Sequence, residues 1–317
     1  MTATPESEPH RHEHPASGPS HDARDPAVAP ASAAVWSASV LENVPIARDT
    51  YRLRLAAPGL AKFIRPGQFA MVRPGPEGAS DPLLGRPFAL YDVVLDGAGE
   101  PAAVDLVYLV VGRGTGALAG RRPGERLSVW GPLGNGFGAP PRGDVVFVAG
   151  GLGQTPFLAL GRWWMGRMAY GGERIARPIS AAPLMLYGVR SEPLLAGLDD
   201  FRSAGIAVEV ATDDGSAGHH GYVTDLLAAR LERGPLPARV IGCGPAPMLA
   251  ALSRLTSKYE VPCEVSLENH MACGFGACFS CVAPIRQPNG SADLRRVCVE
   301  GPIFPADAVD WSGMHGQ

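Results

Sequence analysis

The sequence predicts a mixed fold, in which a small antiparallel β-barrel is followed by a parallel α/β domain and a short cysteine-rich C-terminal domain. Three observations lead to this prediction. Six short apolar runs, each bounded by Gly, Pro or Asp, lie between Val35 and Phe137, as in a small barrel. From Asp144 onward, apolar strands alternate with helical segments, as in a parallel sheet. After Val261, four of the six cysteines fall in one short stretch.

The length and composition are compatible with several domains, because the chain has 317 residues, of which 46% are hydrophobic. We expect a disordered tail over residues 1–33, the barrel over 34–138, the α/β domain over 139–262 and the cysteine domain over 263–317. A net charge of −3 gives no sign of nucleic-acid binding, and no apolar run is long enough to span a bilayer. Without a signal peptide, the cysteines fit a reducing cytoplasm.

The tail from Met1 to Ala33 is rich in Pro, Ala, Ser and His and has almost no large apolar side chains. Such a segment cannot bury enough surface to order itself. Its histidines could bind a metal adventitiously, but a solvated extension is the favoured interpretation.

The barrel region supplies six predicted strands, namely Val35–Leu41, Thr50–Leu55, Gln68–Val72, Phe88–Val94, Val104–Val111 and Arg126–Val129. The α/β region supplies four more, namely Val145–Ala149, Leu184–Gly188, Ala207–Thr212 and Arg239–Gly242. Helices are expected near Leu194–Ser203, Val223–Leu231 and Ala246–Lys258. The stretch from Trp163 to Ala182 is longer than a usual connection, so we expect a helix extension and an insertion loop there.

Two loops of the α/β region have the composition of nucleotide-binding turns. Gly150, Gly151, Gly153, Thr155 and Pro156 follow a strand and precede a helix, so backbone amides there could approach a pyrophosphate. A tight turn without a ligand is the alternative. The second loop contains Cys243, Gly244 and Pro245, whose small size leaves room for a flat ring. Cys243 could lie beside a nicotinamide or could be a buried thiol.

Two further motifs in the barrel region could contact a phosphate. Arg86, Pro87, Phe88 and Ala89 open a strand, and an arginine in that place can hold a phosphate by paired hydrogen bonds. The later run Gly112–Thr115 offers backbone amides and a hydroxyl. Each motif alone is weak evidence, because such turns are common.

The cysteine segment carries the most specific motif. Cys273, Cys278, Cys281 and Cys298 form a C-x4-C-x2-C-x16-C pattern, with three cysteines on one glycine-rich loop and a distant fourth, which is the spacing of plant-type [2Fe–2S] ligation. A four-cysteine zinc site is one alternative, although such sites usually have two close pairs with two residues between the cysteines. Disulfides are the other, although three cysteines within nine residues pair poorly.

Taken in order, these motifs resemble those of the ferredoxin-NADP reductase superfamily, and within it those of electron-transfer subunits of NAD-linked, two-subunit dihydroorotate dehydrogenases. The motifs that carry the resemblance are Pro66–Phe69, Arg86–Phe88, Gly114-Thr115, Gly131–Phe137, Gly150–Pro156, Thr212–Ser216, Gly221–Asp225, Gly242–Pro245, Ser266–Glu268 and the four cysteines. The resemblance covers roughly residues 35–304. The tail and the 163–182 insertion have no counterpart in it.

The resemblance implies FAD in the barrel, NAD on the α/β domain and a [2Fe–2S] cluster on the four cysteines. The residues it places along the FAD are Arg86, Pro87, Phe88, Ala89, Val107, Tyr108, Leu109, Gly114 and Thr115. Where this chain has Ala89, the family usually has Ser or Thr, so a hydroxyl near the flavin is missing. A flavin is needed between the other two cofactors because NAD exchanges a hydride, whereas the cluster passes single electrons. No side chain is assigned a role in acid–base catalysis.

The resemblance also implies a partner. This is an FMN-containing dihydroorotate dehydrogenase catalytic subunit, in a heterotetramer with two copies of each chain, which serves pyrimidine biosynthesis. One alternative is a subunit of a sulfur- or hydrogenase-linked NAD(P)H reductase, or a free-standing reductase. Arg190 and Ser191 follow a strand where a 2′-phosphate could lie, which leaves NADP open. A zinc-stabilised binding module is an alternative of another class, but it leaves the two nucleotide-type loops unexplained.

Overall fold

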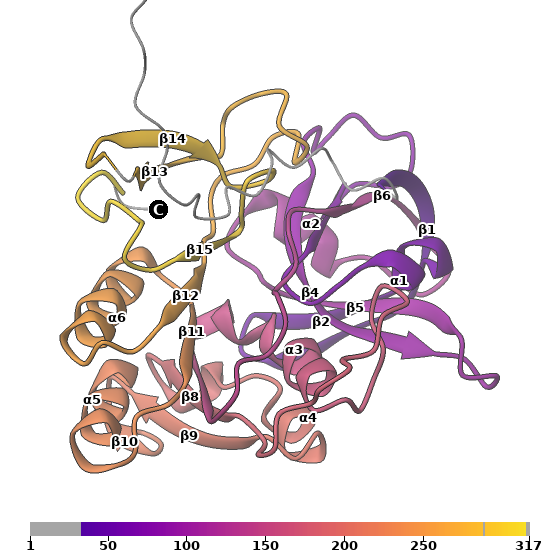
Figure 1. Ribbon diagram of the computed structural model, residues 1–317. Helices are drawn as coiled ribbons and strands as arrows, with labels where there is room; N and C mark the ends of the chain where they lie inside the picture. Colours follow the sequence, from indigo (N-terminus) through magenta and orange to yellow (C-terminus); the bar gives the residue numbers. More distant parts are fainter. Residues whose placement is uncertain (1–32, 288, 315–317) are drawn as a thin grey trace, which may run out of the picture.

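The computed structural model describes residues 33–287 and 289–314 and confirms the predicted fold class. Figure 1 shows the barrel in indigo and magenta beside the α/β sheet in magenta and orange. In this view a smaller C-terminal part, in yellow, lies above the α/β sheet and beside the barrel. The predicted tail falls outside the described residues except for Ala33, and so do its histidines at positions 10, 12, 14 and 21.

Six antiparallel strands close the barrel in the order β1-β2-β5-β4-β3-β6. They are β1 (Ala34–Ala47), β2 (Thr50–Ala56), β3 (Phe69–Val72), β4 (Arg86–Leu95), β5 (Pro101–Leu109) and β6 (Arg126–Leu133). In β2 the buried Leu53 and Leu55 alternate with the half-buried Arg52 and Arg54, as expected for a strand with one apolar face. The short helices α1 (Pro58–Phe63) and α2 (Arg113–Ala119) were not predicted.

The α/β part has a seven-stranded sheet in the order β10-β9-β8-β7-β11-β12-β15, parallel except for β15. Its strands are β7 (Val145–Gly150), β8 (Leu184–Val189), β9 (Ala207–Thr212), β10 (His219–His220), β11 (Arg239–Cys243), β12 (Cys263–Ser266) and β15 (Ile303–Pro305). The chain proceeds outward from β7 through β8 and β9, and then returns to the other side of β7 with β11. This reversal creates a switch point between β7 and β11, where open α/β sheets bind ligands.

The helices of the α/β part agree with the predictions except for one. They are α3 (Phe157–Trp164), α4 (Leu198–Ser203), α5 (Val223–Arg233) and α6 (Ala246–Lys258), with 3-10 turns η1 (Gly151–Gln154) and η2 (Glu192–Leu194). The prediction of a helix from Leu194 was wrong at its start. Gly197 adopts a left-handed conformation with φ of 73°, which interrupts the segment, so α4 begins only at Leu198.

The C-terminal segment interacts with both other parts. Its hairpin, β13 (Val282–Arg286) and β14 (Ala292–Arg296), lies between β12 and β15 in sequence, and both of these strands belong to the seven-stranded sheet. The predicted boundary between residues 262 and 263 thus precedes the last two strands of that sheet, and the division into four segments stays a prediction. On the barrel side, Asn135 N donates to Gly301 O at 2.7 Å.

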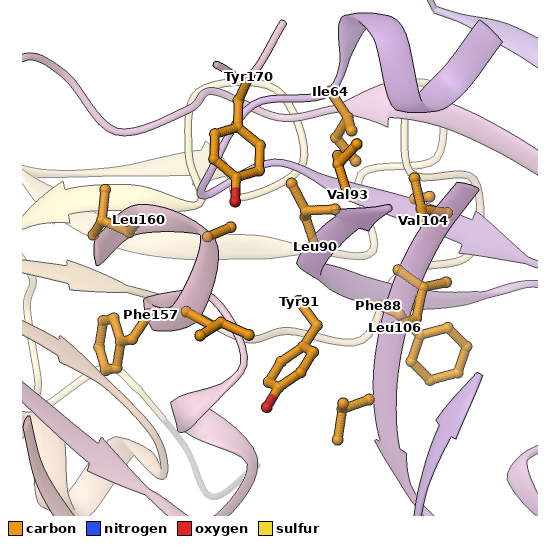
Figure 2. Packing of buried hydrophobic residues seen from close by; sticks show 14 of the residues in the cluster. Ile64, Phe88, Leu90, Tyr91, Val93, Val104, Leu106, Phe157, Leu160 and Tyr170 are labelled. Atoms are coloured by element: carbon orange, nitrogen blue, oxygen red, sulfur yellow. The ribbon is translucent and has the colours of Figure 1, made fainter. Parts of the chain in front are cut away.

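A continuous hydrophobic cluster joins the barrel to helix α3. Figure 2 shows Phe157 and Leu160 of α3 in the same cluster as Leu90 and Leu106 of the barrel, and all four side chains are fully buried. The insertion loop after Trp164 contributes Tyr170, which is 1% exposed and donates to Asp92 Oδ1 at 2.6 Å. This packing holds the two parts in one fixed arrangement. In residues 33–314, leaving out 288, we find no helix with the length and apolar character needed to cross a membrane.

Candidate functional site

The four patterned cysteines come together in two pairs. Cys273, Cys278 and Cys281 lie on the loop between β12 and β13, and Cys298 follows β14. The thiol of Cys278 contacts that of Cys273, and the thiol of Cys281 contacts that of Cys298. All six cysteines of the chain lie in its described part, and each is a free thiol.

This arrangement fits a binuclear cluster better than a single ion. In the described ranges 33–287 and 289–314, no three His, Cys, Asp or Glu side chains are grouped closely enough to hold one metal ion. Zinc in a structural site needs four ligands around one centre. Two pairs of thiolates instead match a [2Fe–2S] cluster, in which each iron receives two protein ligands.

The local electrostatics favour thiolates on this loop. A 3.1 Å hydrogen bond with the Ser280 hydroxyl, helped by the backbone N–H groups of Ser280 and Cys273, lowers the pKa of Cys278 to about 6. The neighbouring Cys298 thiol lowers the pKa of Cys281 to about 6, and the pKa of Cys298 is raised in turn by Cys281. Because metals bind the thiolate, donors aimed at these sulfurs prepare the loop for a cluster.

Glycines give the cluster loop its shape. Gly274 and Gly276 have φ angles of 81° and 92°, in the left-handed region that favours glycine. A methyl group on Gly274 would lie 2.6 Å from Met71 Cγ of the barrel. The Trp130 indole N–H also donates to Cys273 O at 2.8 Å. The cluster loop therefore packs directly on strands β3 and β6.

The barrel brings the predicted flavin residues together. Phe88 of β4 and Tyr108 of β5 have ring centroids 5.7 Å apart, and a methyl group on Gly114 would lie 3.0 Å from Arg86 Nε. Thr115 Oγ1 accepts hydrogen bonds from the amides of Val111 and Gly112 at 3.0 and 3.3 Å, which fixes the turn into α2. Of the remaining predicted residues, Pro87 and Ala89 lie on β4, and Val107 and Leu109 lie on β5.

The cluster loop and the flavin motif are separated by one strand. Met71 of β3, which contacts the cluster loop, is paired with Pro87 of β4. Neighbouring strands lie about 4.8 Å apart. The residues predicted for the two cofactors thus lie on, or against, neighbouring strands of the barrel wall.

The two nucleotide-type loops meet at the switch point. A methyl group on Gly153 would lie 2.0 Å from Cys243 O, and one on Gly150 would lie 2.9 Å from Pro245 Cδ. Gly244, with φ of 152°, lies against the backbone of Gly150. These glycines therefore allow the loops to touch each other, whereas a methyl group on Gly151 would meet open space. Contact of either loop with a nucleotide stays a prediction.

Three other predicted residues of these loops either begin helix α3 or are buried. Pro156 is the N-cap of α3 and follows the 3-10 turn η1 closely, so it precedes the helix as expected. Thr155 is buried at 6% exposure. Cys243 is 3% exposed, and burial raises the pKa of its thiol well above the usual value. Its position beside a nicotinamide stays a prediction.

Two polar side chains near these loops belong to named motifs but were not among the predicted site residues. Gln154 of η1 has no exposed surface, and neither its Nε2 nor its Oε1 has a hydrogen-bond partner within the described residues. Glu268 follows β12, and its charge adds to the effect of burial in raising the pKa of the Cys243 thiol. The side chain of Glu268 is exposed to solvent.

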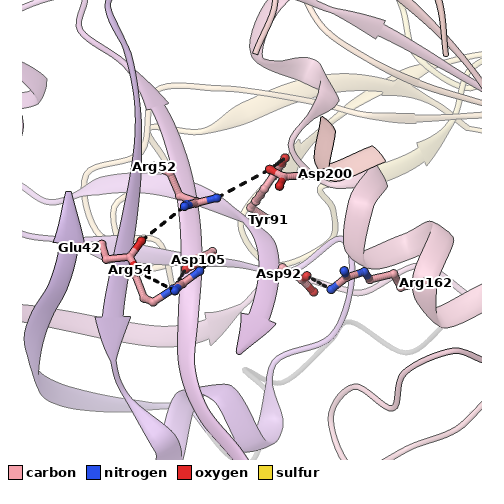
Figure 3. A network of polar contacts seen from close by, with 8 residues as sticks. All are labelled: Glu42, Arg52, Arg54, Tyr91, Asp92, Asp105, Arg162 and Asp200. Carbon is pink, nitrogen blue, oxygen red and sulfur yellow. Dashed lines mark hydrogen bonds and ion pairs between the residues drawn. The ribbon is translucent and has the colours of Figure 1, made fainter. Parts of the chain in front are cut away.

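A polar cavity of about 350 Å³ lies elsewhere, between the barrel and helices α3 and α4. Figure 3 shows the network around it, in which Tyr91 donates to Asp200 at 2.7 Å and Arg162 pairs with Asp92. Arg54 makes two 2.8 Å hydrogen bonds to Asp105. No predicted cofactor residue lines this cavity, so we regard the network as a brace between the two parts.

Comparison with known proteins agrees with this geometry. Residues 268–310 match the model of the iron-sulfur cluster binding domain of dihydroorotate dehydrogenase B. The chain is 34% identical to the electron transfer subunit of dihydroorotate dehydrogenase B (NAD(+)) of Desulforamulus reducens, over 87% of this chain and 98% of that protein. It is 35% identical to the subunit of the same name in Shouchella clausii, over 86% and 96% of the two chains.

A solved structure extends the comparison to three dimensions. This chain is similar to one chain in the structure of the NADH-dependent reduced ferredoxin-NADP oxidoreductase, which was solved to study flavin-based electron bifurcation. The two chains superpose with a TM-score of 0.71 and are 27% identical. The match covers 87% of this chain and 90% of that chain. The Amycolatopsis cytochrome P450 reductase GcoB, at 24% identity and a TM-score of 0.55 over 72% of this chain and 66% of its own, shares the fold.

Proposed function

Because the chain belongs to the family of electron transfer subunits of dihydroorotate dehydrogenase B, we propose that it carries electrons between a partner dehydrogenase and NAD through a [2Fe–2S] cluster and FAD. It is an oxidoreductase component of the flavin and NAD reductase type. The observation that carries the proposal is the pairing of four cysteines, three of which lie on a loop that packs against β3, the strand next to the flavin motif.

Each cofactor has a proposed set of residues. The cluster is held by Cys273, Cys278, Cys281 and Cys298. The FAD lies along Arg86–Ala89, Val107–Leu109, Gly114 and Thr115. The NAD lies over Gly150, Gly151, Gly153, Thr155, Pro156, Cys243, Gly244 and Pro245. When bound, the flavin exchanges a hydride with NAD and single electrons with the cluster, and the protein supplies position and electrostatics.

The proposed partner is an FMN-containing catalytic subunit that oxidises dihydroorotate, in a heterotetramer with two copies of each chain. The exposed side of the cluster loop supports a docking site there. Cys278 is exposed and is flanked by Phe275 and Phe279, which are 53% and 61% exposed. The guanidinium of Arg296 lies 5.0 Å from the ring centroid of Phe279. Exposed aromatics with an arginine are typical of interface cores.

The proposed nucleotide is NAD rather than NADP, and the proposed location is the cytoplasm. Arg190 follows β8, but Asp213 and Asp214 follow β9 directly beside it, with the amide of Asp214 donating to Arg190 O at 3.2 Å. Two carboxylates there disfavour a 2′-phosphate. Parallel assays with NADH and NADPH test the choice of nucleotide, and faster reduction by NADPH would contradict it.

The proposed location rests on the cysteines. Six free thiols fit a reducing compartment such as the cytoplasm.

Co-expression with a dihydroorotate dehydrogenase catalytic subunit tests the assignment of the partner. We expect a stable complex that oxidises dihydroorotate with NAD+, and Phe279→Ala should weaken the complex by about 10-fold or more. As the matched control, Leu236→Ala removes an exposed apolar side chain from another part of the chain. Absence of a complex, with no NAD+-dependent oxidation of dihydroorotate, would refute this partner.

The structural comparison supports a second candidate. The chain with a TM-score of 0.71 comes from an NADH-dependent reduced ferredoxin-NADP oxidoreductase. In this second proposal, a ferredoxin-type donor or another reductase subunit replaces the dihydroorotate-oxidising partner at the same cluster loop. Stimulation of NADH formation by reduced ferredoxin, with none by dihydroorotate and its dehydrogenase, would favour it.

A further inference from the structure

The two cysteine pairs of the candidate cluster site have different surroundings. Cys281 and Cys298 are 1% and 3% exposed and belong to the same hydrophobic cluster as Met71 of the barrel. Cys278, in the other pair, is exposed. Among the described residues, Cys278 is the patterned cysteine whose sulfur lies within hydrogen-bond distance of a hydroxyl, that of Ser280 at 3.1 Å. The outer pair therefore has a hydroxyl beside it, whereas the inner pair packs among apolar side chains.

The Ser280 hydroxyl is held by backbone groups from the start of the cluster loop. The amide of Ala272 donates to Ser280 Oγ at 3.2 Å, and His270 O lies 3.3 Å from the same oxygen, within reach of its proton. Both of these residues precede the first cysteine of the loop, whereas Ser280 lies between the second and the third. Although Ser280 is exposed, its oxygen is thus fixed beside the sulfur of Cys278.

The chemistry of the two side chains decides which of them donates. A serine hydroxyl has one proton, so at any moment it donates to Cys278 Sγ or to His270 O. A sulfur that binds a metal is a thiolate, which has no proton and can only accept a hydrogen bond. In a loaded site the hydroxyl must therefore be the donor across the 3.1 Å contact. The Ala272 amide donates to the hydroxyl oxygen, which polarises the hydroxyl and strengthens the bond to sulfur.

A donor in this place acts on the charge of the cluster. Four thiolates and two sulfides leave a [2Fe–2S] cluster anionic, and reduction by one electron adds a further negative charge. A hydrogen bond to a ligand sulfur stabilises the more negative state more strongly, and so it raises the reduction potential. Hydrogen bonds that favour the charged form of a carboxylate act with the same sign.

We propose that Ser280 is a positioning residue that acts through Cys278, and that its hydroxyl makes the cluster easier to reduce. This inference rests on the proposed function, in which single electrons pass between the flavin and the cluster. The hydroxyl keeps its proton throughout, because only an electron enters or leaves. A higher cluster potential favours electron transfer from the flavin to the cluster and disfavours transfer in the opposite direction.

A redox titration of the full chain, followed by electron paramagnetic resonance of the reduced cluster, tests this role. In Ser280→Ala the equilibrium between oxidised and reduced cluster should shift about 10-fold towards the oxidised form, which corresponds to about 59 mV for one electron. Ser280→Thr keeps the hydroxyl and should restore most of the wild-type potential. Ser312→Ala is the matched control, because it removes a hydroxyl of the same C-terminal segment that lies 2.7 Å from Asp310 Oδ1. Its potential should equal that of the wild type.

The hydroxyl proton provides a second, spectroscopic readout. Pulsed electron paramagnetic resonance of the reduced wild type should show a coupling to a proton that exchanges rapidly in heavy water. Ser280→Ala should lack this coupling, and Ser280→Thr should retain it. A role confined to holding the loop in shape would not produce such a coupling.

The outcomes distinguish this inference from the proposed function. Full iron content with an unchanged potential in Ser280→Ala would overturn the inference, and so would an equal fall of the potential in Ser280→Ala and Ser280→Thr. Loss of iron from Ser280→Ala would make the hydroxyl a structural brace of the loop and also overturn it. Wild-type protein that binds iron but shows no rapidly exchanging coupled proton would do the same. Wild-type protein that binds neither iron nor FAD would refute the proposed function itself.

Discussion

The cluster loop and the two nucleotide-type loops are all rich in glycine, but their glycines meet different neighbours. In the cluster loop, Gly274 and Gly276 have positive φ angles that turn the backbone so that nearby sulfurs converge. At the switch point, Gly153 and Gly150 are needed because loops from two separate strands touch there. Three of the four cysteines of the first site lie on one short loop, and only Cys298 comes from beyond the β13–β14 hairpin, whereas the second site exists only after the sheet has formed.

The largest expected effect comes from removing a cysteine of the inner pair. Cys298 is 3% exposed and pairs with Cys281, so Cys298→Ala should abolish cluster binding. Because metal binding contributes to the folding of such segments, the thermal midpoint should fall by about 2–4 °C for each kcal/mol lost. Iron analysis and thermal unfolding measure both effects. Cys263→Ala, which removes a thiol outside the pattern, should retain its iron, and loss of iron there would contradict the ligand assignment.

The next effect tests the contact between the nucleotide loops. A methyl group on Gly153 would lie 2.0 Å from Cys243 O, so Gly153→Ala should destabilise the fold by about 3 kcal/mol, the upper end of the range for overpacking. Gly151→Ala is the matched variant. A methyl group on Gly151 would face open space, so the cost comes only from an alanine held at a φ of 56°. We therefore expect Gly151→Ala to lower the free energy of unfolding by about 1–2 kcal/mol. Urea unfolding of both variants measures the difference, and equal costs would show that the two loops do not pack as described.

The smallest effect concerns Gln154, whose buried amide has no partner among the described residues. An unpaired buried amide costs about 1–3 kcal/mol, so Gln154→Met should stabilise the cofactor-free protein by roughly 1 kcal/mol. Thermal unfolding of the two proteins provides the comparison. If Gln154→Met instead lowers the midpoint, the amide has a partner in solution, and the nucleotide loop differs from the structure at that point.

The sequence predicted those features that depend on short contiguous patterns. The six barrel strands follow apolar runs between Gly, Pro and Asp, and the cysteine spacing indicated the cluster directly. The short helices α1 and α2 were missed because six or seven residues give too little periodicity. The pairing of Cys281 with Cys298, and the position of Glu268 beside Cys243, depend on contacts between distant segments. No local pattern reveals such contacts.

The central claim is that one chain joins a [2Fe–2S] cluster to a flavin. Its most direct test is the visible spectrum of the full chain purified without oxygen, together with iron, sulfide, zinc and flavin analysis. We predict superposed flavin and iron-sulfur absorbance, with roughly two irons, two sulfides and one FAD per chain. A colourless protein that contains zinc and no flavin would contradict the account.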